Sequence, residues 1–165
     1  MSKEETNGIL ITGIGNSGRK DDGLGWLMLD FIKEHFPALE ICYRYQLQIE
    51  DAEMISTYRT VIFIDATKEE TSDGFYLKVC QPNQGFGLTS HLLSPETVLY
   101  LEHSLYGKKP LTYILGIQGY QWGLSQEPSQ KALTNLKKAQ EFLLQNLDLL
   151  LQNTYQPGKK YSNMM

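Results

Sequence analysis

The pattern of apolar and polar residues along the chain predicts that strands and helices alternate. An apolar run from Ile9 ends at Ile14, and a helical pattern, with apolar residues three and four positions apart, begins at Leu24. Similar patterns continue along the rest of the chain. Strands are predicted near residues 9–14, 39–46, 61–64, 75–80 and 111–117, and helices are predicted to begin at Leu24, Asp51, Pro95 and Pro128. Asp51 and Ser94 are the expected N-caps of the second and third helices.

Two features of this pattern determine the expected sheet. Residues 61–64 form a continuous β-branched and aromatic run, which is typical of a strand covered on both faces. The polar segment 68–73 is too short for a crossover helix, so the strand at 75–80 is expected to be an antiparallel edge. We therefore predict one α/β domain at residues 8–151, a three-layer α/β/α sandwich with a mostly parallel sheet of about five strands. Residues 1–7 and 152–165 are expected to be flexible termini.

Composition and charge narrow the possible functions. The chain has 165 residues, of which 41% are hydrophobic and 21% are charged, as in an ordinary globular protein. Its formal net charge of −4 argues against nonspecific binding to nucleic acid, which needs a basic face. No secretion signal is recognisable, and no apolar run approaches the ~18 residues of a membrane span. We therefore expect a cytoplasmic protein with no nucleic-acid or membrane partner.

The cysteines and two of the histidines belong to no recognisable motif. Cys42 and Cys80 are far apart and form no C-x-x-C pair, so they are expected to be reduced residues of the core or the strands. His35 and His103 fall on predicted helices and are expected to be solvated or to lie at helix ends.

The loop after the first strand contains GIGNSG, which matches the dinucleotide-binding pattern G-x-G-x-x-G. In that pattern the third glycine opens a helix, and the N-terminus of this helix holds the pyrophosphate. Here the helical pattern begins only at Leu24, and two acids, Asp21 and Asp22, precede it. A dinucleotide-binding domain is one alternative because of the glycine pattern, although the late helix start and the two acids differ from that pattern. In a purely structural alternative the glycines form a tight turn and the acids favour a helix start.

Three polar residues are expected at one end of the sheet, where the carboxyl ends of the parallel strands meet. Asp22 follows the first strand, Asp65 ends the third, and His91 lies in a loop before a helix. In open α/β sheets, ligands bind at the carboxyl ends of the strands. Two carboxylates and an imidazole suit Ni²⁺, Zn²⁺ or a similar ion. By residue type alone, such aspartates are more often caps or hydrogen-bond acceptors and such a histidine is more often merely exposed, so the metal site is at this stage a hypothesis.

The whole loop resembles the signature G-x-G-N-x-x-x-x-D-[DE]-G-x-G of the hydrogenase maturation proteases. The matching positions are Gly13, Gly15, Asn16, Asp21, Asp22, Gly23 and Gly25. The similarity extends to the strand VIFIDA, to the segment from Ser90 to Pro95 and to the LYGKKP turn. It implies a phosphorylase/hydrolase-like fold, nickel contacts from Asp22, Asp65 and His91, and catalytic roles for Asp22 and Asp65. It also implies substrate binding by Gly15, Asn16, Asp21, Gly23 and Ser90.

The resemblance further implies a specific activity. Members of this family are endopeptidases of the aspartyl type that remove a C-terminal extension from the precursor of the large subunit of a nickel-iron hydrogenase after nickel insertion. The nickel is carried by the precursor and serves as the recognition mark, and the protease is expected to be a monomer. Many members carry D-G-G-T-x-G after the second strand, where this chain reads YQLQIEDAE. Which class of hydrogenase would be processed therefore stays open.

Two further alternatives come from other functional classes. GIGNSG also resembles the G-x-G-N-P-G of peptidyl-tRNA hydrolases, but those esterases need a histidine shortly after the loop, where this chain reads RKDDGLG. A non-catalytic protein that docks on a partner through a metal would use the same three ligands.

Overall fold

The computed structural model describes residues 8–85, 93–125 and 127–152. Its centre is a five-stranded sheet with the order β2-β1-β3-β5-β4. The strands are β1 (Ile9–Ile14), β2 (Glu40–Arg44), β3 (Thr60–Thr67), β4 (Phe75–Val79) and β5 (Leu111–Gln118). The helices are the 3₁₀ helix η1 (Lys20–Gly23), α2 (Leu24–His35), α3 (Glu50–Ser56), α4 (Pro95–Leu105) and α5 (Gln130–Leu151). The predicted α/β fold is confirmed.

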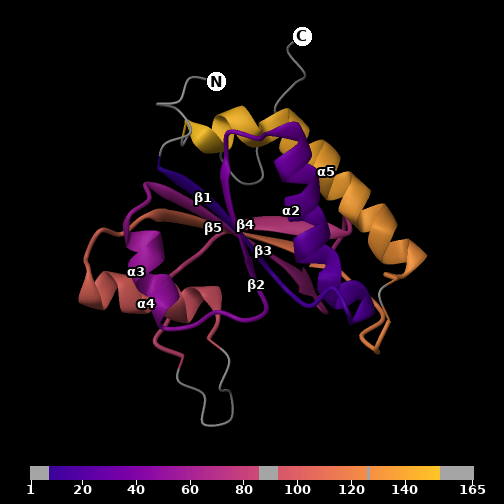
Figure 1. The fold of residues 1–165 in the computed structure, drawn as a ribbon, viewed down its shortest axis with the longest axis horizontal. Coiled ribbons are helices and arrows are strands. Elements are labelled where there is room, and N and C mark those ends of the chain that lie inside the picture. Colours follow the sequence, from indigo (N-terminus) through magenta and orange to yellow (C-terminus); the bar gives the residue numbers. More distant parts are fainter. Residues whose placement is uncertain (1–7, 86–92, 126, 153–165) are drawn as a thin grey trace.

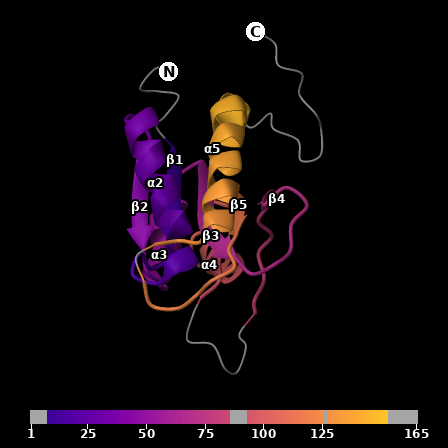
Figure 2. The same cartoon turned by 90° about the vertical axis from the view of Figure 1, so that its right-hand side faces the viewer.

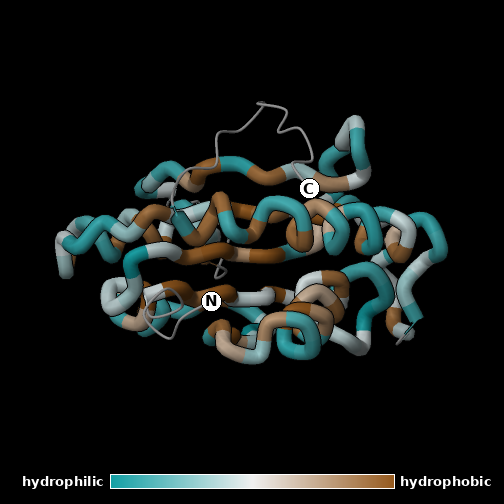
Figure 3. Tube along the Cα trace, turned by 90° about the horizontal axis from the view of Figure 1, so that it is seen from above, coloured by the Kyte–Doolittle hydropathy of each residue, from teal (hydrophilic) through white to brown (hydrophobic). Residues whose placement is uncertain are grey.

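Helices cover both faces of the sheet. Helices α2 and α5 lie on one face, and α3 and α4 lie on the other (Figure 1). Side chains alternate along β1, so that Ile9 and Ile11 belong to the core under α2 and α5, whereas Leu10 and Ile14 belong to the core under α3 and α4. The central strands β1, β3 and β5 are accordingly largely apolar and buried, and Figure 3 shows hydrophobic segments running through the middle of the molecule.

Pairing of the central strands brings their carboxyl ends together. Strand β1 lies between β2 and β3, and all of these strands and β5 run parallel. Residues 61–64 of β3 are at most 1% exposed, which explains the apolar run that predicted a strand covered on both faces. The chain therefore leaves β1 at Gly15 at the same end of the sheet as Asp65 of β3, where the carboxyl ends of the parallel strands meet.

The fifth strand runs in the opposite direction. Strand β4 pairs antiparallel with β5, from Phe75 opposite Ile117 to Val79 opposite Tyr113, as the short polar connection before it predicted. Figure 2 shows β4 at one edge of the sheet and β2 at the other. A side chain at Gly116 would collide with the ring of Tyr76, so glycine at this position lets Tyr76 lie flat against β5.

The helix ends agree with the expected cap in α4 and differ from it in α3 and α5. Ser94 caps α4, because its hydroxyl oxygen accepts a hydrogen bond from the Thr97 N–H at 3.1 Å. Helix α5 begins at Gln130 and not at Pro128, because Ser129 is its cap and accepts from the Ala132 N–H at 3.3 Å. The expected cap Asp51 lies instead in the first turn of α3, where its carboxylate binds the Arg44 side chain and the Gln48 N–H.

None of the helices in the described part of the chain is both long enough and apolar enough to span a membrane. The expected flexible termini were residues 1–7 and 152–165; Gln152 is described as the C-cap of α5, and the others lie outside the described residues.

Candidate active site

The loop after β1 turns back on itself and fixes the position of Asp22. The Asn16 N–H donates to the Asp22 carbonyl at 3.0 Å, and the Asn16 side chain accepts from the Gly18 N–H at 2.8 Å. Gly15 has a φ of +153°, and a side chain there would collide with the Asp22 carbonyl oxygen. Gly15 and Asn16 thus shape the loop, and their expected contact with a substrate stays a prediction.

The same geometry argues against a dinucleotide site. Gly18, the third glycine of GIGNSG, does not open a helix, since η1 intervenes and α2 starts only at Leu24. The acidic residues Asp21 and Asp22 lie in this intervening turn, where the fingerprint would place a pyrophosphate at a helix N-terminus.

Gly25 brings the first turn of α2 close to the strand ends. A side chain on Gly25 would lie 2.5 Å from the Ile14 carbonyl oxygen and 2.8 Å from the Ile64 carbonyl oxygen. Only glycine permits this approach, which places the residues just before α2 next to the end of β3. Asp22 is consequently near enough to Asp65 for its charge to act on the Asp65 carboxyl group.

Asp22 and Asp65 influence each other electrostatically. Burial raises the pKa of Asp65 to about 7, with a further increase from the negative charge of Asp22, while a hydrogen bond from the Ala66 backbone opposes the change. Burial also raises the pKa of Asp22, against the lowering effects of Arg19, of Lys68 and of a hydrogen bond from the Asn16 backbone. The structure therefore brings together two of the three predicted metal ligands.

Two cationic residues near the carboxylates were missed in the sequence. Arg19 and Lys68 both act on the pKa of Asp22, and the Lys68 ammonium lies 5.2 Å from the centre of the Trp122 ring. The position of Lys68, three residues after Asp65 in the loop that leaves β3, was the available signal. Arg19 lies within the signature but at one of its variable positions.

Asp21 has a different environment from Asp22. It is 0% exposed, and its carboxylate accepts hydrogen bonds from the N–H groups of Tyr120, Gln121 and Ser129 and from the Ser129 hydroxyl. Burial alone would raise the pKa of Asp21, but these four hydrogen bonds hold it below its usual range. We predicted Asp21 as a substrate-binding residue, whereas its oxygens are engaged within the chain. Any effect of Asp21 on a substrate would act through the segment that it holds.

The remaining predicted site residues differ in what the structure says of them. Gly23 is buried, and a side chain there would lie 3.1 Å from the Ser17 Cα, so glycine lets the loop close against η1. Its expected contact with a substrate is untested. His91 and Ser90 lie outside the described residues. Within the described ranges, histidine, cysteine, aspartate and glutamate side chains form no group of three that could hold a metal ion.

The other histidines and the cysteines agree with expectation. His35 is exposed and its ring nitrogen contacts the Phe31 carbonyl at 2.9 Å, and His103 lies in the last turn of α4. Both cysteines are free thiols, and Cys80 is buried while Cys42 is partly buried. Burial raises the pKa of Cys42 and raises that of Cys80 to about 12, so neither thiol is activated as a nucleophile.

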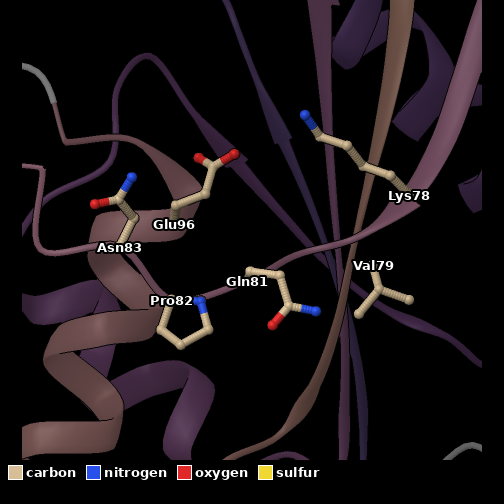
Figure 4. A pocket seen from close by; sticks show the side chains of 6 residues that line it. All are labelled: Lys78, Val79, Gln81, Pro82, Asn83 and Glu96. Atoms are coloured by element: carbon tan, nitrogen blue, oxygen red, sulfur yellow. The ribbon is translucent and has the colours of Figure 1, made fainter.

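Two shallow pockets lie elsewhere on the surface. One, of about 300 Å³, is lined by residues of β4, of the segment after it and of the first turn of α4, including Lys78, Gln81, Asn83 and Glu96 (Figure 4). The other, of about 210 Å³, lies beside the loop after β1 and includes Trp26. Neither pocket is lined by Asp22 or Asp65.

Comparison with known proteins gives matches to solved structures. No protein-family model and no curated protein matches the chain. Solved structures do match. The [NiFe] hydrogenase maturation protease HycI from Thermococcus kodakarensis KOD1 is 23% identical, with a TM-score of 0.65 over 89% of this chain and 94% of that chain.

Two further matches carry similar names. The hydrogenase 2 maturation peptidase from Thaumarchaeota archaeon SCGC_AB-539-E09 is 21% identical, with a TM-score of 0.61 over 86% of this chain and 98% of that one. The hydrogenase maturating endopeptidase HybD from E. coli is 18% identical, with a TM-score of 0.59 over 85% of this chain and 91% of that one. The resemblance predicted from the loop signature is thereby confirmed in three dimensions, and the chain has the fold of the solved [NiFe] hydrogenase maturation proteases.

Proposed function

We propose that this protein is an endopeptidase that removes the C-terminal extension of a [NiFe] hydrogenase large-subunit precursor after nickel has been inserted. The observation that carries the proposal is the pairing of Asp22 with Asp65 at the carboxyl ends of β1 and β3. The structural similarity to the maturation proteases supports the choice of reaction and substrate. In this proposal the protein acts as a monomer in the cytoplasm.

A divalent cation fits the electrostatics of the pair. The pKa of Asp65 is raised to about 7 because its charged form is poorly solvated and lies near the charge of Asp22. A cation between the two carboxylates would remove this repulsion, and oxygen ligands are suited to a first-row ion such as nickel. Nickel enters this scheme as part of the precursor, and His91 is the proposed third ligand from the protease.

The carboxylates can also serve the hydrolysis itself. Cleavage of a peptide bond by water needs a group that accepts a proton from the attacking water and returns one to the leaving amine. Asp22 or Asp65 could accept that proton, and their pKa values, raised above the usual range, bring them closer to neutral pH. Neither cysteine is needed in this scheme.

The test uses the purified protein with two forms of one precursor. We expect cleavage of the nickel-loaded precursor, seen by mass spectrometry as the loss of a C-terminal peptide, and no cleavage of the nickel-free form or of casein. The nickel of the loaded precursor would bridge the two proteins and fix the scissile bond near Asp22 and Asp65.

The possible results separate this proposal from its alternatives. Equal cleavage of both precursor forms would reject nickel recognition and leave a peptidase. Nickel-dependent binding without cleavage would indicate a docking protein. Hydrolysis of peptidyl-tRNA, with the precursor untouched, would indicate an esterase.

A further inference from the structure

Asp21 joins the loop after β1 to a segment about one hundred residues further along the chain. Its carboxylate oxygen Oδ2 accepts from the Tyr120 N–H at 2.6 Å, from the Gln121 N–H at 2.8 Å and from the Ser129 hydroxyl at 2.8 Å. Oδ1 accepts from the Ser129 N–H at 2.6 Å. All of these partners lie between the end of β5 and the start of α5, in the segment 119–129, of which the structure describes every residue but 126.

Backbone hydrogen bonds reinforce this connection. The Asp21 N–H donates to the Gln121 carbonyl at 3.0 Å, and the Lys20 N–H donates to the Ser125 carbonyl at 2.6 Å. In return the Ser125 N–H donates to the Gly18 carbonyl at 3.1 Å. The residues on the amino side of Asp22 are thus held along their length by the segment 119–129.

The packing around the Asp21 side chain also depends on a small neighbouring residue. A side chain on Gly119 would lie 2.7 Å from the Asp21 Cβ, so glycine at 119 leaves room for the aspartate. Asp21 also contacts Ser129, whose hydroxyl caps α5, so one carboxylate fixes both the segment and the start of that helix.

We propose that Asp21 is a positioning residue, which holds η1 against the segment 119–129 and thereby keeps Asp22 at the end of the sheet where Asp65 lies. This inference rests on the proposed endopeptidase function, in which Asp22 acts on the substrate or its nickel. Asp22 is joined directly to Asp21, so a shift of η1 would move it. Displacements of about 1 Å in a catalytic group can cost about 100-fold in rate.

The first test is Asp21→Asn, which keeps the shape of the side chain. An amide has one accepting oxygen and a donating NH₂ group, so part of the four hydrogen bonds is lost and a donor faces other donors. We expect the cleavage rate at saturating nickel-loaded precursor to fall at least about 10-fold in protein that remains folded.

Glu102→Gln is the matched control for a buried carboxylate. Glu102 is 0% exposed and accepts from the N–H groups of Lys108 and Lys109 at 2.7 to 3.1 Å. It lies near the start of β5, at the amino ends of the parallel strands, whereas Asp65 lies toward their carboxyl ends. This variant should also lose thermal stability, but its rate at saturating precursor should equal that of the wild type.

Both variants are assayed well below their melting temperatures. A saturating rate of Asp21→Asn equal to that of Glu102→Gln would overturn the proposal. If Asp21→Asn does not fold, Ser129→Ala decides, because it removes only the bond between the hydroxyl and Asp21 together with one cap. A reduced saturating rate in Ser129→Ala supports positioning, and an unchanged one overturns it.

A second readout separates this proposal from the proposed function. The backbone amide signal of Ala66, which donates a hydrogen bond to Asp65, should shift in NMR spectra of Asp21→Asn and stay in place in Glu102→Gln. If the wild type cleaves no precursor, the proposed function fails, while the Ala66 amide shift still reports whether Asp21 holds Asp22. An unchanged signal in Asp21→Asn would overturn the positioning role whatever the activity.

Discussion

Asp22 and Asp65 are electrostatic neighbours, because the negative charge of Asp22 adds to the rise in the pKa of Asp65 that burial causes. The relationship follows from parallel pairing of β1 with β3, from the tight loop closed by Gly15, and from the close approach that Gly25 allows. Residues 43 positions apart are thereby brought to one end of the sheet.

The first prediction concerns this pair in the metal-free protein. Asp22→Asn removes the neighbouring charge, so the pKa of Asp65 should fall from about 7. It should stay above the ordinary 3.8, because burial is the larger cause of the shift. Titration of the carboxyl carbon signals by NMR measures the change. An unchanged pKa would mean that the two carboxylates are not coupled.

The second prediction concerns stability and pH. The pKa of Asp65 is about 7 in the folded protein and near 3.8 in an unfolded chain, so between these values the folded state binds more protons. Stability must therefore fall as the pH rises through this range. Asp65→Asn does not titrate, so above pH 7 its free energy of unfolding should exceed that of the wild type by on the order of 1 kcal/mol or more.

Urea unfolding at several pH values tests this second prediction. The advantage of Asp65→Asn should shrink below pH 4, where the wild-type carboxyl is protonated in both states. A constant difference across the whole range would show that the effect arises from packing and not from the charge of Asp65.

The third prediction concerns activity. Asp22→Ala, Asp65→Ala and His91→Ala should each abolish cleavage of the nickel-loaded precursor while circular dichroism spectra stay native. His35→Ala is the control, because His35 is exposed on α2 and should be dispensable. An alanine variant that still cleaves would remove its residue from the site.

The fourth prediction concerns the thiols. Burial raises the pKa of Cys80 to about 12 and also raises that of Cys42, so iodoacetamide at pH 8 should react slowly with the native protein and rapidly after unfolding. Cys42→Ala combined with Cys80→Ala should keep cleavage activity, with mild loss of packing. A folded but inactive double variant would point to a thiol mechanism.

The sequence contained much of the fold because its signals are local. The apolar run at residues 61–64, the Ser94 cap and the short polar connection before β4 each depend on neighbouring residues, and each was interpreted correctly. Parallel strands align their carboxyl ends, so the meeting of Asp22 and Asp65 also followed from the order of elements.

What could not be predicted depends on distant partners. Asp21 and Asp22 are adjacent acids in the same motif, yet the first is engaged by Tyr120, Gln121 and Ser129, whereas the charge of the second acts on Asp65. Periodicity carries no information about such contacts. Asp51 likewise fits a cap pattern but binds Arg44.

The partners of Asp21 also have a consequence for synthesis and folding. They lie 99 to 108 residues beyond it, after all five strands. A nascent chain that has made β1 and β3 already contains both Asp22 and Asp65, but the contacts that hold η1 form only when β5 and the start of α5 have emerged. Contacts of such long sequence separation form late in folding. The chain should therefore complete the placement of its two acids only as one of the last steps of folding, after residues 119–129 have left the ribosome.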